Sequence, residues 1–193
     1  VNLSSVGAHV PDGTGPVAGL HRAEQALNIL PGANIKHLRP GYFFLNFLAN
    51  IDLVKNAGII GGNFGDEKSK MILAHPDDIA AVAFEELTDL DFRGISVRYI
   101  ASDQKTTSEV ATAIGKAIGK SELPWIRFSD ADALKGMTNA GLPVEIARNY
   151  VEMGNAIVSG LLFEDYWKHH PEKPGTVKLE DFAKRFAAVY SAS

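Results

Sequence analysis

The pattern of apolar residues over positions 1–41 predicts two strands joined by a helix. Residues 1–5 form a short strand-like stretch, and the Gly-, Pro- and Asp-rich residues 7–16 are typical of a loop. Pro16 suits the start of a helix, and apolar side chains then recur at helical spacing: Val17, Leu20, Ala23, Leu27 and Leu30. Residues 34–38 predict a second strand, which Arg39-Pro40-Gly41 ends. This order is a βαβ unit, and such units form parallel sheets.

The rest of the chain predicts more strands at first and mostly helices later. We expect a helix over residues 42–50, a polar, Gly-rich excursion over 58–74 with a strand at 71–74, and a strand over 95–101. A helix from Pro76 should bury Ile79, Val82, Ala83 and Leu87. Thr106-Thr107-Ser108-Glu109 matches a capping box at the start of an amphipathic helix. A strand over 125–128 and helices over 130–139, 143–160 and 179–190 complete an α/β chain. We expect one domain, with residues 1–102 carrying the sheet and residues 103–193 mostly helical.

The composition excludes several classes of protein. The 193 residues are 46% hydrophobic and 22% charged, which is typical of a globular domain. The absence of Cys excludes disulfide scaffolds, Cys-ligated zinc, iron–sulfur clusters and thiol catalysis. With 19 Lys and Arg against 23 Asp and Glu and no basic stripe, we expect no nucleic-acid partner. No apolar run reaches the ~18–20 residues of a membrane span. We therefore expect a cytoplasmic protein without a membrane partner.

Short motifs follow one another along the first hundred residues. Leu3-Ser4-Ser5-Val6-Gly7 precedes the Gly-Pro helix start, and His37-Leu38-Arg39-Pro40-Gly41-Tyr42-Phe43, Asn46 and His75-Pro76-Asp77-Asp78-Ile79-Ala80 come later. In this order and spacing they resemble the NmrA-like branch of the atypical short-chain dehydrogenase/reductase superfamily. In that branch a strand ends in Ser-Ser, a helix carries a Glu (here Glu24), and the next strand ends in Arg-Pro-Gly before an aromatic residue and an Asn. The resemblance weakens from Val1 to about Tyr99.

The resemblance implies the C-terminal part of a Rossmann-type doubly wound parallel sheet, followed by a mostly helical substrate-side region. It implies NAD or NADP as the cofactor, with the nicotinamide half beside Ser4, Ser5, Pro40, Gly41, Tyr42 and Phe43. His9 and Asn46 are second-choice residues on the substrate side. A purely structural interpretation stands beside this one, because Ser-Ser and Arg-Pro-Gly often only end a strand. Aromatic clusters are also more often core, and we expect Phe44 and Phe47 to be buried.

Two features of such enzymes are missing from the sequence. A Rossmann site opens with a strand, a Gly-rich turn and a helix that holds the pyrophosphate. Residues 58–65 are Gly-rich but lead into Asp66-Glu67-Lys68-Ser69-Lys70, so we interpret them as a loop beside the cleft. No Tyr has a Lys four residues later, and Pro16 and Leu20 stand where such a pair would fall. We expect the chain to be part of a longer protein and to bind NAD(P) weakly or not at all by itself.

The remaining polar residues suggest no catalytic group directly. His9 and His21 follow the first strand and could face the cleft, His75 is a candidate helix cap, and His169-His170 suits a solvated turn. Glu152, Glu164 and Asp165 are expected on a solvated surface, and no His/carboxylate spacing indicates a metal. Three functions stay open: an NAD(P)-binding reductase-like protein or redox sensor, an NAD(P)H-dependent quinone or azo-type oxidoreductase with a planar substrate, and a non-catalytic regulatory or interaction module. A homo-oligomer is left open.

Overall fold

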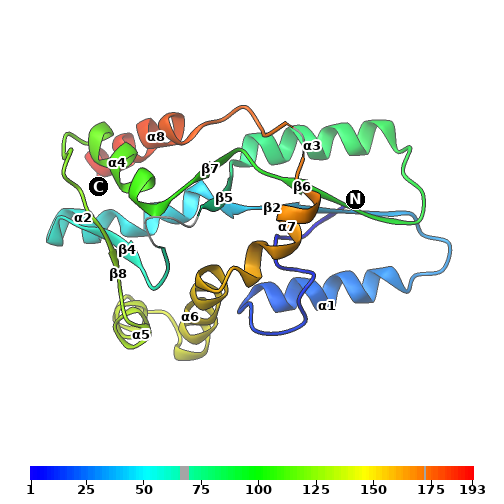
Figure 1. Cartoon of the computed structure of the whole chain (residues 1–193), viewed down its shortest axis with the longest axis horizontal. Helices are drawn as coiled ribbons and strands as arrows, with labels where there is room; N and C mark the ends of the chain where they lie inside the picture. The colour runs from blue at the N-terminus through cyan, green and yellow to red at the C-terminus, as the bar shows by residue number, and fades with distance from the viewer. Residues whose placement is uncertain (66–69, 172) are drawn as a thin grey trace.

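The first layer of the fold is a three-stranded parallel sheet, seen in a computed structural model that describes residues 1–65, 70–171 and 173–193. Its strands are β1 (Asn2–Leu3), β2 (Ile35–Pro40) and β6 (Ile95–Ile100), in the order β1-β2-β6. The helices α1 (Val17–Asn28) and α3 (Pro76–Asp89) cover its opposite faces (Figure 1). The strand–helix–strand prediction for residues 1–41 is therefore confirmed, and the fold class is α/β.

Alternation along β2 assigns its side chains to the two faces of the sheet. Leu38 is buried in a small apolar cluster with residues of α3 and β6. His37 and Arg39 face α1 instead, where they hydrogen-bond Asn28 and Glu24. Successive residues of a strand point to opposite faces. One strand thus contributes Leu38 to an apolar cluster on the α3 side, and His37 and Arg39 to polar contacts on the α1 side.

The outer side of α3 differs from the prediction. Ile79 is buried against the sheet, and Val82 and Ala83 are partly buried there. Leu87, which we expected on the same buried face, is 57% exposed. The prediction was wrong at this residue because the periodicity of a helix does not show how far along it the covering sheet extends.

A second sheet replaces the beginning of a predicted helix. β3 (Tyr42–Phe43) pairs in parallel with β5 (Met71–Ala74), which pairs antiparallel with β7 (Asp103–Lys105). The helix expected over residues 42–50 is instead a 3-10 helix, η1 (Phe44–Asn50), which leads into α2 (Ile51–Ala57). The prediction was wrong at Tyr42 and Phe43 because pairing with Leu73 and Ala74 holds them extended. Local periodicity carries no information about a pairing partner so distant in sequence.

The Gly-rich residues 58–65 contain a strand, so their interpretation as a simple loop was wrong. β4 (Ile60–Gly62) pairs in parallel with β8 (Trp125–Arg127). A Cβ atom on Gly61 would lie 2.1 Å from the carbonyl oxygen of Ile126. Glycine is therefore required for this close approach of two backbones. Of the polar segment that follows, residues 66–69 lie outside the described residues.

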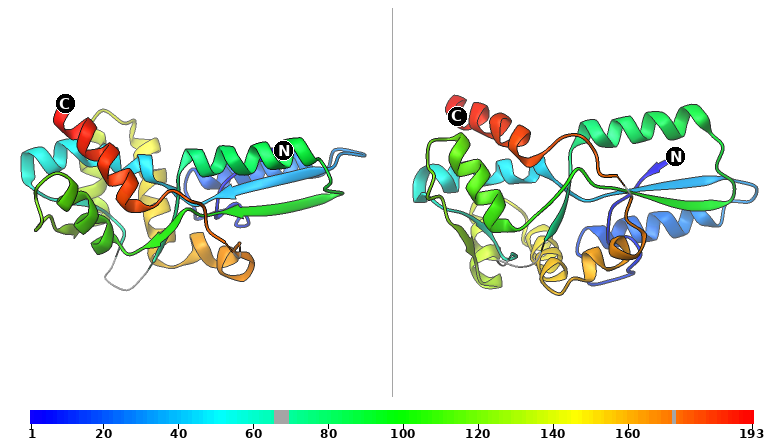
Figure 2. Two further views of the ribbon diagram at one scale, coloured as in Figure 1. Left: turned by 90° about the horizontal axis from the view of Figure 1, so that it is seen from above. Right: turned by 45° about the horizontal axis from the view of Figure 1, so that its top comes forward.

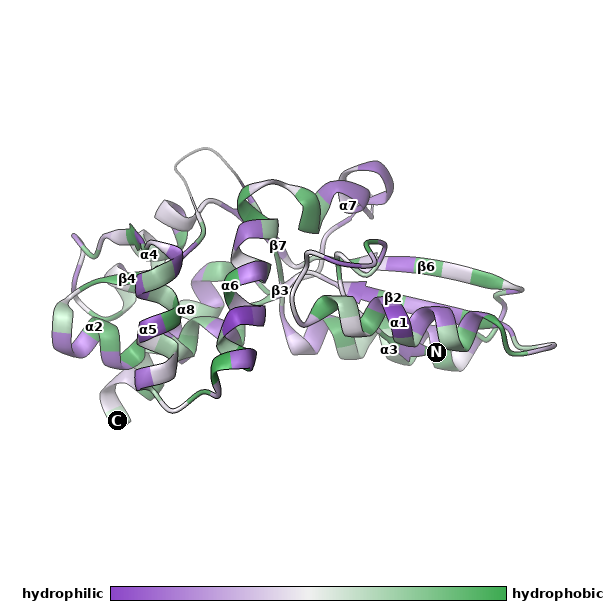
Figure 3. Ribbon diagram, turned by 90° about the horizontal axis from the view of Figure 1, so that it is seen from below, coloured by the Kyte–Doolittle hydropathy of each residue, from purple (hydrophilic) through white to green (hydrophobic). Residues whose placement is uncertain are grey.

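The second half of the chain is mostly helical, as predicted. It contains α4 (Thr107–Ala117), α5 (Asp130–Asn139), α6 (Val144–Val158), η2 (Leu161–Phe163), α7 (Glu164–His169) and α8 (Leu179–Ala192). The expected capping box of Thr106 and Glu109 starts α4. Figures 2 and 3 show an elongated molecule, with the three-stranded sheet, α1 and α3 at one end and α4, α5 and α8 at the other.

The larger apolar core lies under η1, α4 and α8. Phe44 and Phe47 are at most 1% exposed, which confirms their predicted core positions. The ring of Phe44 stacks on Phe182 of α8 with centroids 5.4 Å apart. Burial of such rings stabilises the fold by about 25 cal/mol for each Å² of apolar surface removed from water.

Asp78 of α3 fixes the segment that connects α7 to α8. Its buried carboxylate accepts hydrogen bonds from the Ser102 hydroxyl at 2.6 Å and from the backbone N–H groups of Thr176 and Val177 at 2.8 and 3.2 Å. Burial alone would raise the pKa of Asp78, but these hydrogen bonds outweigh it and lower the pKa. The C-terminal helix is thereby tied to the three-stranded sheet.

Candidate functional site

The carboxyl ends of β1 and β2 lie side by side. Beyond the strand residues, the amide of Ser4 donates to Leu38 O at 2.7 Å and that of Val6 donates to Pro40 O at 2.9 Å. The amide of Gly41 donates in turn to Ile100 O of β6, also at 2.9 Å. The loops that follow β1 and β2 therefore leave the sheet at one edge, as the βαβ prediction required.

The six residues predicted for the cofactor wall lie at this edge and differ in burial. Ser4, Pro40 and Gly41 are buried, whereas Ser5, Tyr42 and Phe43 are half-buried. A Cβ atom on Gly41 would lie 2.4 Å from the carbonyl oxygen of Ile72, so the space beside Gly41 is filled by the backbone of β5. The buried three thus form a support, and the half-buried three are the ones that reach the surface.

The side chain of Tyr42 makes mostly core contacts. Its ring packs against Phe47 and Phe64, with centroids 5.4 and 5.7 Å away. Its hydroxyl is hydrogen-bonded to the side chain of Asn46, and burial raises its pKa. Asn46 is exposed, and Phe43 packs against the small cluster around Leu38. An aromatic wall for a planar substrate stays a prediction.

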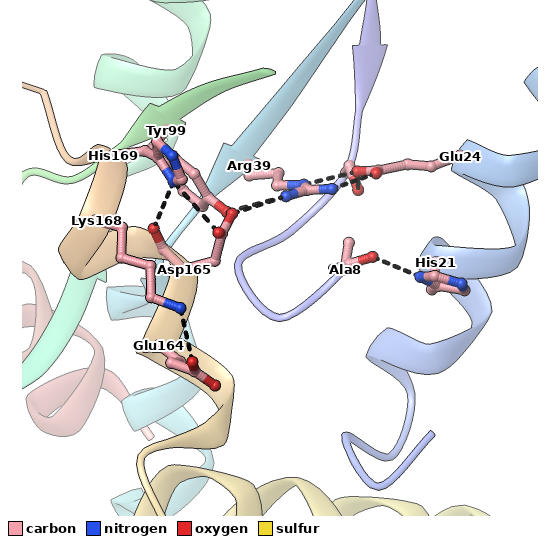
Figure 4. Close-up of polar contacts among 10 residues, drawn as sticks. Ala8, His21, Glu24, Arg39, Tyr99, Glu164, Asp165, Lys168 and His169 are labelled. Atoms are coloured by element: carbon pink, nitrogen blue, oxygen red, sulfur yellow. Dashed lines mark hydrogen bonds and ion pairs between the residues drawn. The ribbon is translucent and has the colours of Figure 1, made fainter. Parts of the chain in front are cut away.

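A buried polar network joins the end of β1 to helix α7 (Figure 4). The Ser4 hydroxyl donates to Glu24 Oε1 at 2.5 Å. Arg39 donates to the same carboxylate twice, from Nε at 3.0 Å and from Nη2 at 2.5 Å. Its Nη1 donates to the Tyr99 hydroxyl at 2.9 Å, and that hydroxyl donates to Asp165 Oδ2. We call these five residues the Arg39 network.

The opposite charges of Arg39 and Glu24 stabilise each other, although both side chains are buried. The side chains of Arg39 and Glu24 are 9% and 2% exposed. Burial alone would raise the pKa of Glu24, but the hydrogen bonds from Arg39 and Ser4 outweigh it and lower the pKa. Burial likewise opposes the charge of Arg39, and its hydrogen bonds to Glu24 and Tyr99 raise its pKa. Both groups stay ionised at neutral pH.

Asp165 was wrongly predicted to be a solvated surface residue. Its side chain is 23% exposed, and Oδ2 lies 3.4 Å from Arg39 Nη1. Its outer side faces a surface pocket of about 290 Å³ lined by Val97, Tyr99, Asp165 and His169. Neighbouring Glu164 does lie at the surface, paired with Lys168. Sequence offered no signal for Asp165, because its partners are on other elements and their contact depends on the fold.

His21, His37 and His75 have structural partners, His9 has none among the described residues, and His169 and His170 are exposed. His21 Nδ1 contacts Ala8 O at 2.9 Å (Figure 4), His37 contacts Asn28 and Asn2, and His75 caps α3 as predicted. The ring nitrogens of His9 are buried and have no hydrogen-bond partner among the described residues. Burial lowers the pKa of His9, although Asp165 acts in the opposite direction. A neutral imidazole with unused donor and acceptor positions lies in the loop after β1.

Within the described part of the chain, no group of three or more His, Asp or Glu is placed to hold a metal ion. No helix there has the length and apolar character that crossing a membrane requires.

Sequence comparisons identify no relative, whereas solved structures resemble the chain over nearly its whole length. No protein-family model and no curated protein matches. The NADPH complex of the quinone oxidoreductase QOR2 from Escherichia coli superposes with a TM-score of 0.77 at 22% identity, covering 95% of this chain and 63% of that one. Triphenylmethane reductase of Citrobacter sp. with NADP(H) gives 0.72 at 18% identity, covering 95% of this chain and 63% of that one. NmrA, a negative transcriptional regulator, in complex with NAD gives 0.69 at 12% identity, covering 98% and 64%.

This chain therefore spans less than two thirds of the length of these structures. All three were solved with NAD or NADP(H), and all share its arrangement of strands and helices. The predicted resemblance is confirmed at the level of the fold: the chain has the fold of NmrA-like, NAD(P)-binding proteins of the Rossmann type.

Proposed function

We propose that this chain supplies the nicotinamide side of a dinucleotide site in a reductase-like or redox-sensing NAD(P)-binding protein. The observation that carries the proposal is the meeting of two loops, Ser4–Ser5 and residues 40–43, at one carboxyl edge of a parallel sheet. Open α/β sheets bind their ligands at this edge. The similar structures were solved with NADPH, NADP(H) or NAD, which supports a dinucleotide as the ligand.

The residues at the edge fit a flat, polar ring. Ser5 and the backbone of Tyr42 and Phe43 would contact the nicotinamide, because the Tyr42 and Phe43 rings pack against the apolar clusters. Buried Ser4, Pro40 and Gly41 hold this backbone in place. Exposed Asn46, whose amide also bonds the Tyr42 hydroxyl, would bind a substrate placed against the nicotinamide. His9 has two ring nitrogens without a partner, but both are buried, so His9 would reach that substrate only if the loop after β1 moves. When bound, NAD(P)H supplies the hydride, which is the difficult chemistry of such a reaction.

The pyrophosphate half of the cofactor has no comparable site among the described residues. Among the described residues, one Gly-rich segment runs from a strand into a helix: residues 7–16, between β1 and α1. It is a long loop and not a tight turn, and the space beside Gly15 at its end is filled by the backbone of Asn149, so the first amides of α1 do not form a phosphate site of the Rossmann kind. We expect this chain alone to bind NAD(P) weakly and mainly through the nicotinamide. Tight binding by this chain would contradict that expectation.

Saturation-transfer NMR tests the proposal, because it detects weak binding and reports which ligand protons touch the protein. With NADPH or NADH, we expect stronger transfer to nicotinamide protons than to adenine protons. Ser5→Leu should abolish the difference, because a larger side chain at the edge excludes the ring. Ser108→Leu, at an exposed position of α4, is the matched control. Equal transfer to both rings, or none at all, would overturn the proposal.

Two alternatives are distinguished by turnover. A quinone or azo-type reductase is favoured by the fold shared with QOR2, and hydride transfer to such acceptors needs no Tyr–Lys pair. Such a pair would fall at Pro16, which directly precedes α1, and at Leu20, which lies in its first turn. Oxidation of NADPH by a quinone indicates the reductase, and binding without turnover indicates the sensor. A regulatory or interaction module that binds no dinucleotide would show neither.

A further inference from the structure

The Arg39 network holds more carboxylate than its cation needs. Glu24 alone neutralises Arg39 through two hydrogen bonds from the guanidinium. Asp165 adds a second carboxylate: its Oδ2 lies 3.4 Å from Nη1, Tyr99 bridges the two groups, and its Oδ1 lies 3.2 Å from Nδ1 of His169. The side chain of Asp165 is 23% exposed, whereas the pair of Arg39 and Glu24 is nearly buried. Because Glu24 already neutralises the buried guanidinium, the contact of Asp165 with Arg39 calls for an explanation of its own.

The position of Asp165 supplies that explanation. Asp165 belongs to α7 in the helical half of the chain. Glu24 belongs to α1, and Arg39 belongs to strand β2 of the three-stranded sheet. Figure 4 shows Asp165 and Glu24 reaching Arg39 from opposite sides. The Arg39 network thus connects α7 to the sheet through polar contacts, next to the carboxyl end of β2.

Two residues of the Arg39 network adjoin the proposed cofactor wall. Arg39 directly precedes Pro40 and Gly41, and Ser4, which donates to Glu24, directly precedes Ser5. The backbone hydrogen bonds from Val6 to Pro40 and from Gly41 to Ile100 join the same segments. A shift of the guanidinium would therefore be transmitted to the two loops that form the wall.

We propose that Asp165, Tyr99 and Arg39 are positioning residues that couple the docking of α7 to the geometry of the strand-end wall, an inference that rests on the function proposed above. The coupling works through Arg39. With Asp165 in place, the guanidinium is held from both sides, and Ser4 and Pro40 keep one arrangement. Without it, Arg39 keeps Glu24 and the Tyr99 hydroxyl, but that hydroxyl has lost its own acceptor, and the wall loosens while the apolar cores stay packed.

Amide hydrogen exchange measured by NMR tests the coupling in the full chain. For Asp165→Asn we expect the amides of Val6 and Gly41 to exchange about five-fold faster or more, while amides of α4 stay within about two-fold. Glu164→Gln is the matched control, because Glu164 is the preceding residue of α7 and pairs only with exposed Lys168 among the described residues. It should change neither set. The Arg39 Nε–H resonance should broaden or shift in Asp165→Asn alone.

A second variant, Tyr99→Phe, tests the same coupling if Asp165→Asn folds poorly. Tyr99→Phe keeps the ring that packs edge-on against Tyr166 and removes only the hydroxyl that bridges Arg39 and Asp165. It should accelerate exchange at Val6 and Gly41 in the same way. Uniform acceleration that includes α4, or no difference from Glu164→Gln, would overturn the coupling, because a merely stabilising network predicts those outcomes.

The outcome for the coupling is separable from the outcome for dinucleotide binding. Nicotinamide saturation transfer that falls several-fold in Asp165→Asn and stays unchanged in Glu164→Gln supports both proposals together. If the unchanged chain shows no transfer from any dinucleotide, the proposed function fails. The exchange rates then decide the coupling alone.

Discussion

Replacing Glu24 by Gln is expected to destabilise the protein far more than an ordinary loss of one surface charge. The Glu24 side chain is 2% exposed and accepts three hydrogen bonds, two from Arg39 and one from Ser4. Gln has a single acceptor oxygen, and its NH₂ group would face the N–H donors of Arg39. The substitution keeps the volume and removes the charge, so the effect reports on polar pairing.

The magnitude follows from what Arg39 loses. Removing one partner of a buried ion pair typically costs about 3–5 kcal/mol, because a charge is left buried without compensation. Asp165 remains 3.4 Å from Arg39 Nη1 and compensates in part. We therefore expect a loss near the lower end of that range, about 3 kcal/mol. Arg39→Met added to Glu24→Gln should recover part of the loss, because it removes the uncompensated charge.

Urea unfolding followed by circular dichroism measures this difference. Glu85→Gln is the matched control, since Glu85 forms a 2.8 Å ion pair with Arg98 but its side chain is 54% exposed. Exposed pairs contribute at most about 1 kcal/mol. Losses of similar size in the two variants would refute the inference that the Arg39 network is buried and mutually compensated.

The pH dependence of the same difference has a definite sign. The pKa of Glu24 is lowered in the folded protein, so the unfolded chain binds the proton more readily. The stabilisation is therefore complete above the unfolded value of about 4.3 and is lost as the pH falls through the folded value. The difference in the free energy of unfolding between Glu24→Gln and the unchanged chain should be largest at pH 7 and should decrease in acid.

Three further predictions concern other parts of the fold. Asp78→Asn should cost about 2–3 kcal/mol and speed proteolysis before α8, because the carboxylate accepts several buried hydrogen bonds, whereas Asp77→Asn, whose side chain is 82% exposed, should change little. Gly41→Ala should lower the melting temperature, because its Cβ would lie 2.4 Å from a β5 carbonyl, whereas Gly136→Ala, inside α5 with open space around it, should raise it. The C2 proton of His9 should titrate below pH 6.5 in NMR, because burial lowers the pKa of its ring. Since the unfolded chain then binds this proton more readily, His9 should lower the free energy of unfolding as the pH falls below 6.5.

Local chemistry explains which parts of the fold could be predicted. The capping box at Thr106, the Pro start of α3 and the helical spacing after Pro16 act within a few residues, so the sequence shows them directly. The parallel order of β1 and β2 followed from the single helix between them. The adjacency of Ser4 and Pro40 then follows from geometry.

Other features depend on partners far along the chain. Tyr42 and Phe43 are extended because β5 pairs with them, and Gly61 belongs to a strand because β8 lies beside it. Asp165 is part of the Arg39 network because α7 packs where β6 presents Tyr99. No periodicity within one segment carries such information, and this is why the strand-end residues were predicted while the part of Asp165 in the Arg39 network was not.

Mapping of backbone amide shifts during an NADPH titration tests the central claim most directly. The claim is that the loops after β1 and β2 form the nicotinamide side of a dinucleotide site. It predicts that the largest shifts, at high ligand concentration, fall on Ser5, Gly41 and Tyr42 at the shared edge of the sheet. Shifts confined to other surfaces, or an unchanged spectrum at every NADPH concentration, would contradict it.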